Sequence, residues 1–242
     1  MKSSTAMWSA APITNNYLLF TVLSTLVASV GLLKNDVAVV IGAMVIAPLL
    51  GPNLAFALGA AMGDSRLMQR SAWTGIIGIL ISGCMGVLIG KFWPADGLTS
   101  QELMARTSVD LHGMVIALSS GVAAVLSLTT GLSSTLVGVM VAVALLPPTV
   151  TIGIMLGASQ WEHAFGATLL LMVNVVCLNL AALIVFTVQG VQPRTWLEKR
   201  AARQSRVLHF FVWFGLLGLL MAVILLSGEA HPLHVVIGVF GV

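Results

Sequence analysis

The chain has 242 residues, of which 58% are hydrophobic and only 8% are charged, with a formal net charge of +3. Its mean hydropathy is +1.05, whereas soluble proteins carry about 25% charged residues. A soluble domain of this length has no interior large enough for so much apolar surface, so the composition excludes one. We therefore expect an integral membrane protein whose main partner is the lipid bilayer, and no nucleic-acid partner.

Seven apolar segments follow one another along the chain and predict membrane-spanning helices. They cover residues 17–33, 37–63, 73–92, 114–128, 132–157, 164–188 and 207–226. The last apolar stretch, 232–242, is shorter than the roughly 20 helical residues that cross a hydrocarbon core. It is expected to re-enter the membrane or to begin an eighth helix. The N-terminal residues 1–15 lack an apolar core, and we expect no cleaved signal peptide.

Two of the segments contain nearly the same twelve residues. Residues 41–52 read IGAMVIAPLLGP and residues 137–148 read VGVMVAVALLPP, and six of the twelve aligned positions are identical. Prolines are expected to interrupt both helices, because proline removes a backbone donor and clashes with the preceding turn. The pattern predicts two three-helix repeats, 17–92 and 112–188, each with a Pro-broken helix, followed by a helix at 207–226.

The predicted fold is an all-α polytopic membrane helix bundle of about seven spans, forming a single membrane domain over residues 1–242. If each repeat crosses three times, the second is inverted relative to the first, because it enters from the opposite side. We expect the protein in the bacterial cytoplasmic (inner) membrane, with its N-terminus in the cytoplasm.

The positive charges fit two topologies equally well. With the basic loop 194–206 in the cytoplasm, three crossings per repeat leave eight Lys and Arg residues inside and three outside. If the broken segments are re-entrant hairpins, Lys91 and Arg106 exchange sides with Arg66 and Arg70, and the count is again eight to three. A broken segment of about 27 residues exceeds one span, which favours crossing.

Polar residues follow both breaks at aligned positions, Asn53 in the first and Thr149 in the second. Both residue types favour helix N-caps. We interpret each as opening a half-helix whose free N–H groups and positive dipole end point into the protein. Two such ends near the midplane predict a site for an anion or a polar neutral solute. The candidate substrate-binding residues are Pro48, Gly51, Pro52, Asn53, Pro147, Pro148, Thr149, Asn174 and Asn179.

Asn174 and Asn179 both lie inside the sixth segment and need hydrogen-bond partners. Five residues apart, they point about 140° apart around a helix, so they do not both face one point. We expect one to line the site and the other to bond a neighbouring helix.

Glycines four residues apart recur in both halves of the chain. Gly59 with Gly63, and Gly153 with Gly157, predict places where another helix approaches closely. The alternative is that these pairs only reflect the abundance of glycine, since the chain contains 24.

The apolar segments contain no ionisable side chain apart from residues at their ends, which argues against a proton relay through a buried carboxylate. No nucleophile–base arrangement, acid pair or phosphate-binding loop is present, so we expect no enzyme activity and no cofactor. His231 and His234 have helical spacing but lack a third ligand, and we expect no metal site.

Residues 39–71 (VVIGAMVIAPLLGPNLAFALGAAMGDSRLMQRS) and residues 143–186 resemble the two conserved blocks of the domain of unknown function 389 family, a group of bacterial hydrophobic membrane proteins. The resemblance covers residues 20–190 and includes Asn174 and Asn179. Some relatives carry a soluble N-terminal extension that is not seen here, and regulation by it is expected to be absent. The resemblance implies a fold and a membrane location and supplies no activity.

The leading hypothesis is secondary transport or channel-like passage of a small polar or anionic solute, bound between the broken helices. The alternative is a non-transporting membrane scaffold or assembly protein whose helix breaks only shape packing. The partners are then the bilayer and a small-molecule or ion substrate, with a homo-oligomer left open.

Overall fold

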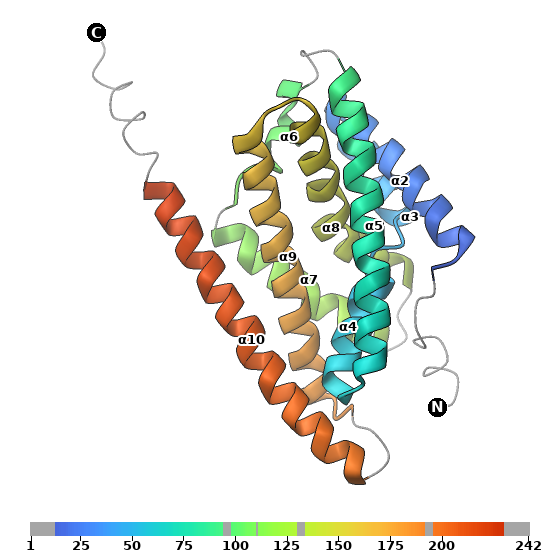
Figure 1. Ribbon diagram of the computed structural model, residues 1–242, viewed down its shortest axis with the longest axis vertical. Helices are drawn as coiled ribbons and strands as arrows, with labels where there is room; N and C mark the ends of the chain where they lie inside the picture. Colours follow the sequence, from blue (N-terminus) through green and yellow to red (C-terminus); the bar gives the residue numbers. More distant parts are fainter. Residues whose placement is uncertain (1–12, 94–97, 110, 130–133, 192–195, 230–242) are drawn as a thin grey trace.

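The computed structural model describes residues 13–93, 98–109, 111–129, 134–191 and 196–229. All regular secondary structure in these residues is helical (Figure 1). The helices are α2 (Asn15–Leu33), α3 (Val37–Ile46), α4 (Leu50–Met62), α5 (Ser65–Phe92), α6 (Gln101–Met104), α7 (Leu111–Thr129), α8 (Ser134–Gly157), α9 (Trp161–Val188) and α10 (Trp196–Glu229). The tail at 232–242, with His231 and His234, lies outside the described residues.

Four described helices are long and apolar enough to cross a membrane: α2, α5, α9 and residues Ala202–Leu226 of α10. Helices α3 and α4 make a fifth candidate if the bent pair is counted as one span. Among the described residues, α7 and α8 contribute the shorter apolar segments His112–Leu126 and Leu145–Gly157. The described helices indicate an integral membrane protein with four or five candidate spans, and they do not confirm the seven that the sequence predicts.

Acidic side chains cap the N-termini of two helices, α3 and α5. Asp36 accepts a hydrogen bond from the backbone N–H of Val39 (3.1 Å) and so caps α3. Asp64 accepts from the N–H groups of Arg66 and Leu67 (both 3.0 Å) and caps α5. A carboxylate at this position satisfies backbone donors that have no partner within the helix.

The break between α3 and α4 follows from the positions of two prolines. Ala47 is extended, with ψ at 124°, because a residue before proline is pushed out of the helical region. The chain resumes its helix at Leu50, and Pro52 falls in the first turn, where the missing N–H would have had no partner in any case. The axes of α3 and α4 differ by 54°.

Helix α8 corrects the prediction of a second break. It runs without interruption from Ser134 to Gly157, with Pro147 and Pro148 inside it. Residues 145–150 are all buried, and the hydroxyl of Thr149 donates to the carbonyl oxygen of Leu145 (2.8 Å). Proline is tolerated inside a membrane helix where neighbouring helices and a Ser or Thr side chain support the backbone. The sequence similarity of the two segments therefore does not produce the same backbone.

Helices α5 and α8 approach each other more closely than ordinary side chains allow. A Cβ added at Gly86 would lie 2.8 Å from the carbonyl oxygen of Val150 and 2.9 Å from Gly153 Cα. Farther along, Gly157 faces the backbone of Lys91. Residue numbers rise together in the two helices, so they run parallel, and Figure 1 shows them side by side. Small residues give two membrane helices this contact between backbones.

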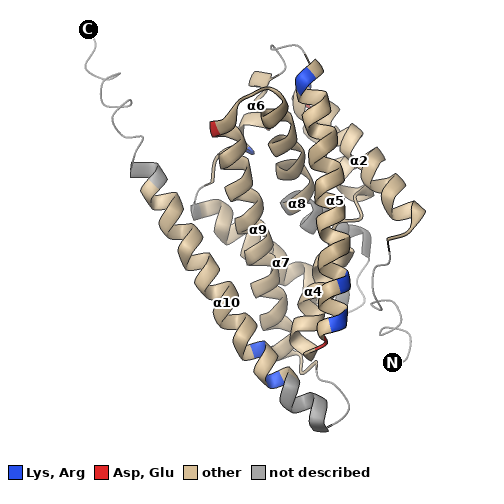
Figure 2. Cartoon of the chain, in the orientation of Figure 1, with Lys and Arg blue, Asp and Glu red and all other residues tan. Residues whose placement is uncertain are grey.

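One end of the bundle carries most of the described positive charge. α5 begins there, and Ser205 of α10 donates to the carbonyl oxygen of Ala60 near the end of α4 (2.9 Å), which brings the start of α10 to the same end. Figure 2 shows the coloured charges at the two ends and uncharged residues between them. We call this end the arginine end, defined by Arg66, Arg70, Arg203 and Arg206.

Loops and the short helix α6 form the opposite end. Ser100 donates to the carbonyl oxygen of Leu32, and the N–H of Glu102 donates to Asn35 Oδ1 (2.9 Å). Lys34 Nζ lies 5.8 Å from the ring centre of Trp93, which follows the last residue of α5. Helix α5 therefore connects the two ends of the bundle.

Candidate functional site

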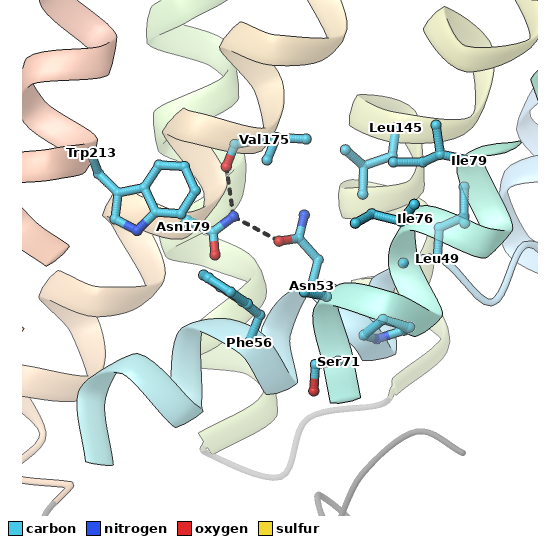
Figure 3. A pocket seen from close by; sticks show the side chains of 13 residues that line it. Leu49, Asn53, Phe56, Ser71, Ile76, Ile79, Leu145, Val175, Asn179 and Trp213 are labelled. Atoms are coloured by element: carbon cyan, nitrogen blue, oxygen red, sulfur yellow. Dashed lines mark hydrogen bonds between the residues drawn. The ribbon is translucent and has the colours of Figure 1, made fainter. Parts of the chain in front are cut away.

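A cavity of about 190 Å³ lies beside the break between α3 and α4 (Figure 3). Five helices or their flanking residues contribute to its walls: α4, α5, α8, α9 and α10. The lining residues are Leu49, Pro52, Asn53, Phe56, Ser71, Ala72, Gly75, Ile76, Ile79, Leu145, Val175, Asn179 and Trp213. The lining is mainly apolar with a few polar groups, which is the usual composition of a small-molecule site.

Two asparagines, 126 positions apart in the chain, meet in this cavity. Asn179 Nδ2 donates to Asn53 Oδ1 (2.7 Å) and to the carbonyl oxygen of Val175 (2.8 Å). The carbonyl of Val175 only accepts, so it fixes which end of the Asn179 amide is nitrogen. That nitrogen in turn requires the oxygen of Asn53 to face it, and Asn53 Nδ2 then points away, toward the space lined by Leu145 (Figure 3).

Two buried polar atoms beside the cavity have no hydrogen-bond partner among the described residues. Asn179 is 2% exposed, and its Oδ1 has no partner among the described residues. Ser71 is 1% exposed, and its Oγ is likewise without a partner there. Buried polar atoms in proteins nearly always have a hydrogen-bond partner, and an exception calls for an explanation. Both atoms belong to residues that line one cavity, so a polar molecule that entered it would find hydrogen-bonding groups without a partner.

Local backbone geometry explains why Asn53 reaches the cavity. Asn53 is the fourth residue of α4, and the capping position belongs to Leu49, which makes no side-chain cap. The prediction that Asn53 caps the half-helix is therefore wrong. The first turn of α4 includes Pro52, so the helix begins at Leu50, three residues before Asn53. The side chain of Asn53 is free to reach α9. Thr149 is not a cap either, since it lies inside α8.

The structure brings together only part of the predicted set. Pro52, Asn53 and Asn179 line the cavity, and so do Leu49 and Leu145, which occupy aligned positions of the two similar segments. The other candidates do not line it: Pro48, Gly51, Pro147, Pro148, Thr149 and Asn174. Asn174 is buried on α9 away from the cavity, as expected for one member of a pair about 140° apart.

Ten of the thirteen lining residues were not predicted from the sequence, and three of these supply a hydroxyl or an aromatic ring: Ser71, Phe56 and Trp213. Ser71 lies between the predicted apolar segments 37–63 and 73–92, so it was not considered as an intramembrane residue. Phe56 and Trp213 make an edge-to-face contact with ring centres 6.1 Å apart, closing one side of the cavity. The sequence did contain one indication of this contact. Trp213 lies inside the apolar segment 207–226, whereas tryptophan in membrane proteins is usually found at the membrane interfaces.

The four glycines predicted for packing have two different roles. A Cβ at Gly59 would lie 2.8 Å from the side chain of Met68 in α5, and one at Gly153 would lie 2.8 Å from Gly86 Cα, so both admit a neighbouring helix. Gly157 does the same against α5. Gly63 instead ends α4 with a positive φ of 71°, a conformation that glycine adopts without strain.

Most of the cavity lies within the part of the chain that matches one protein family. The family described as "Domain of unknown function (DUF389)" matches residues 44–180, which contain every lining residue except Trp213. An uncharacterized protein of Methanocaldococcus jannaschii is 36% identical over 203 residues, covering 84% of this chain and 63% of that protein. The chain thus spans less than two thirds of that relative. No solved structure matches.

Proposed function

This chain belongs to the DUF389 family, and we propose that it is a secondary transporter or channel that passes a small polar solute through the cavity at the α3–α4 break. The observation that carries this proposal is the Asn53–Asn179 pair. It places unused hydrogen-bonding groups in a cavity of about 190 Å³ inside a membrane bundle. An anionic solute has less support than a neutral one, because the lining residues include no cation.

The proposed topology has α3 and α4 crossing the membrane together. α3 begins beside Asn35 at one end of the bundle, whereas α4 ends at Met62 close to the arginine end. A re-entrant hairpin would return to the side from which it entered, and a bend of 54° does not reverse the chain. We place the arginine end in the cytoplasm because positive residues favour that side.

Seven spans follow from this arrangement if α7 and α8 each cross once. In Figure 1 the long helices alternate in direction, α5 rising, α9 descending and α10 rising. The parallel contact of α5 with α8 supports the count, because the third and fifth of seven successive spans run in the same direction. The N-terminus then lies in the cytoplasm of a bacterial cell, and the two three-helix units are inverted relative to each other.

A membrane scaffold is the second candidate, and the continuity of α8 favours it. Only one of two similar segments is broken, and the unbroken one packs tightly on α5 through glycines. In this alternative the break at Pro48 shapes the packing of α4 against α5 and α9 and has no solute to bind.

Solute flux into vesicles containing the purified protein tests the proposal. The panel should include small neutral amides and alcohols, small anions and small cations, with and without a sodium gradient. We expect flux of at least one neutral solute, and at least a tenfold loss for Asn179→Ala. The matched control is Asn174→Ala on the same helix, which should keep the flux because Asn174 does not line the cavity. A folded wild-type protein that passes none of these solutes would leave the scaffold as the better explanation.

A further inference from the structure

The geometry points to an amphiphile as the molecule that this cavity takes: an uncharged hydrogen-bonding head group on an apolar tail, entering sideways from the lipid between α5 and α10. This inference rests on the cavity being the solute site of the proposed function, and it names the class of solute and the route of entry.

The opening of the cavity lies between helices that do not pack on each other. One wall consists of α5 residues, and the opposite wall includes Val175 of α9 and Trp213 of α10. Among the described residues, α5 packs against α2, α4 and α8 but makes no extended contact with α9 or α10. Ile76, in the α5 wall, is 46% exposed and forms part of the rim. The floor is formed by buried residues, Leu49, Pro52, Ser71, Leu145 and Asn179.

The depth of the opening places it against hydrocarbon. At about 1.5 Å per helical residue, Ile76 lies about 9 Å along α5 from Arg70, and Trp213 lies about 10 Å along α10 from Arg206. Asn179 lies about 13 Å from the end of α9 by the same measure. These positions are about a third to a half of the way through a core of about 30 Å. A side opening at this depth meets lipid chains.

The chemistry of the lining suits a neutral head group. Asn53 Nδ2 offers N–H donors, and Asn179 Oδ1 offers an unused acceptor. None of the lining residues is charged, so a carboxylate or an ammonium would enter without a counter-charge, which is costly in a medium of low polarity. A dry cavity of about 150 Å³ holds one benzene ring, so about 190 Å³ accommodates an amide or alcohol head with its first few carbons. The rest of the tail extends between α5 and α10.

Binding of tritiated decanamide to the purified protein in lipid nanodiscs tests this inference, with empty nanodiscs as the background. Four competitors separate head group from tail: unlabelled decanamide, decanoate, decylamine and acetamide. We expect saturable binding that decanamide displaces at least tenfold better than decanoate or decylamine, and that acetamide does not displace. Asn179→Leu should weaken the binding at least fivefold.

The route of entry has its own matched pair of variants. Ile76→Trp places a large side chain in the rim, whereas Ile41→Trp makes the same change at a similarly exposed residue of α3, 42% exposed and outside the cavity. We expect Ile76→Trp to slow or abolish decanamide binding and Ile41→Trp to leave it unchanged. Since both side chains face outward, both variants should fold.

Three outcomes would overturn the inference. The first is the absence of saturable decanamide binding, the second is acetamide competing as well as decanamide, and the third is equal binding by the two tryptophan variants. Flux of water-soluble amides with no decanamide binding would refute this inference alone and leave the proposed transport intact. Decanamide binding without flux of any solute would refute the proposed transport and leave the amphiphile site intact.

Discussion

The hydroxyl of Tyr17 in α2 donates a hydrogen bond to the backbone carbonyl oxygen of Thr74 in α5 at 2.8 Å, across 57 positions of the chain. Thr25 and Ser82 repeat the connection farther along, with a hydroxyl–hydroxyl distance of 2.8 Å. Both contacts are buried. Polar side chains therefore hold these two helices together where the hydrophobic effect gives no preference for protein over lipid.

Removing the Tyr17 hydroxyl should destabilise the bundle moderately. We expect Tyr17→Phe to lower the free energy of unfolding by about 1 kcal/mol, the usual net value of one hydrogen bond. Thermal unfolding of the detergent-solubilised protein measures the effect. Phe20→Leu, at a position of the same helix that is 47% exposed, serves as the control. Equal midpoints for Tyr17→Phe and the wild type would show that the bond adds nothing.

Two neighbouring glycines of α5 should respond to alanine in opposite directions. A Cβ at Gly86 would press on the backbone of α8, and overpacking of this kind costs about 1–3 kcal/mol. A Cβ at Gly83 meets nothing within 4 Å, so Gly83→Ala should stabilise the helix by about 0.5–1 kcal/mol. Thermal unfolding of the two variants side by side gives the comparison. A stabilised Gly86→Ala protein would contradict the close α5–α8 contact.

Gly63→Ala should destabilise the junction of α4 and α5. The positive φ of 71° at this position costs a residue with a Cβ about 1–2 kcal/mol. Gly42→Ala is the control, because Gly42 lies within a helix and a Cβ there meets nothing within 4 Å. The midpoint of thermal unfolding should fall for the first variant alone, and a fall of the same size in both would remove the backbone explanation.

The two asparagines should show coupled effects in a double-mutant cycle. Because Asn53 and Asn179 share a hydrogen bond, the losses of stability in Asn53→Ala and Asn179→Ala should not add. We expect a coupling energy of about 0.5–1.5 kcal/mol in unfolding experiments. Strict additivity in the double variant would mean that the contact is not formed in the bilayer.

Labelling of single cysteines should place the two ends of the bundle on opposite sides of the membrane. In a background without Cys84 and Cys177, a cysteine replacing Ser65 lies at the arginine end, and one replacing Gln101 lies at the other end; both positions are exposed. A maleimide that does not cross membranes should reach the Gln101→Cys protein from outside intact cells and the Ser65→Cys protein only after lysis. Labelling of both from one side would refute the crossing of α5.

Much of this fold was predictable because apolar length and proline positions act locally. The break at Pro48 was predicted because proline removes a backbone donor and clashes with the preceding turn, and α3 indeed ends at Ile46. The same argument failed at Pro147 and Pro148. The packing of neighbouring helices around α8 overrides the local preference of proline, and this packing cannot be read from the local sequence. Asn53 and Asn179 were named as candidates, but their meeting depends on how α4 packs against α9. The packing of α10 against α4 and α9 likewise brings Trp213, from a helix outside both predicted repeats, to the wall of the cavity.

The contact of α5 with α8 also constrains how this protein can move. At Gly86 and Gly153 the two backbones touch without intervening side chains, so no rotamer change lets one helix slide along the other. We therefore expect the two helices to move together, and any conformational change in the proposed transport would have to keep this contact. Residues 47–49 lie between α3 and α4, where no intrahelical hydrogen bonds join the two helices, and this is where we expect the angle between them to change. A rotation there would move Asn53 relative to Asn179, and so would couple a change in the angle between α3 and α4 to the hydrogen bond between the two asparagines.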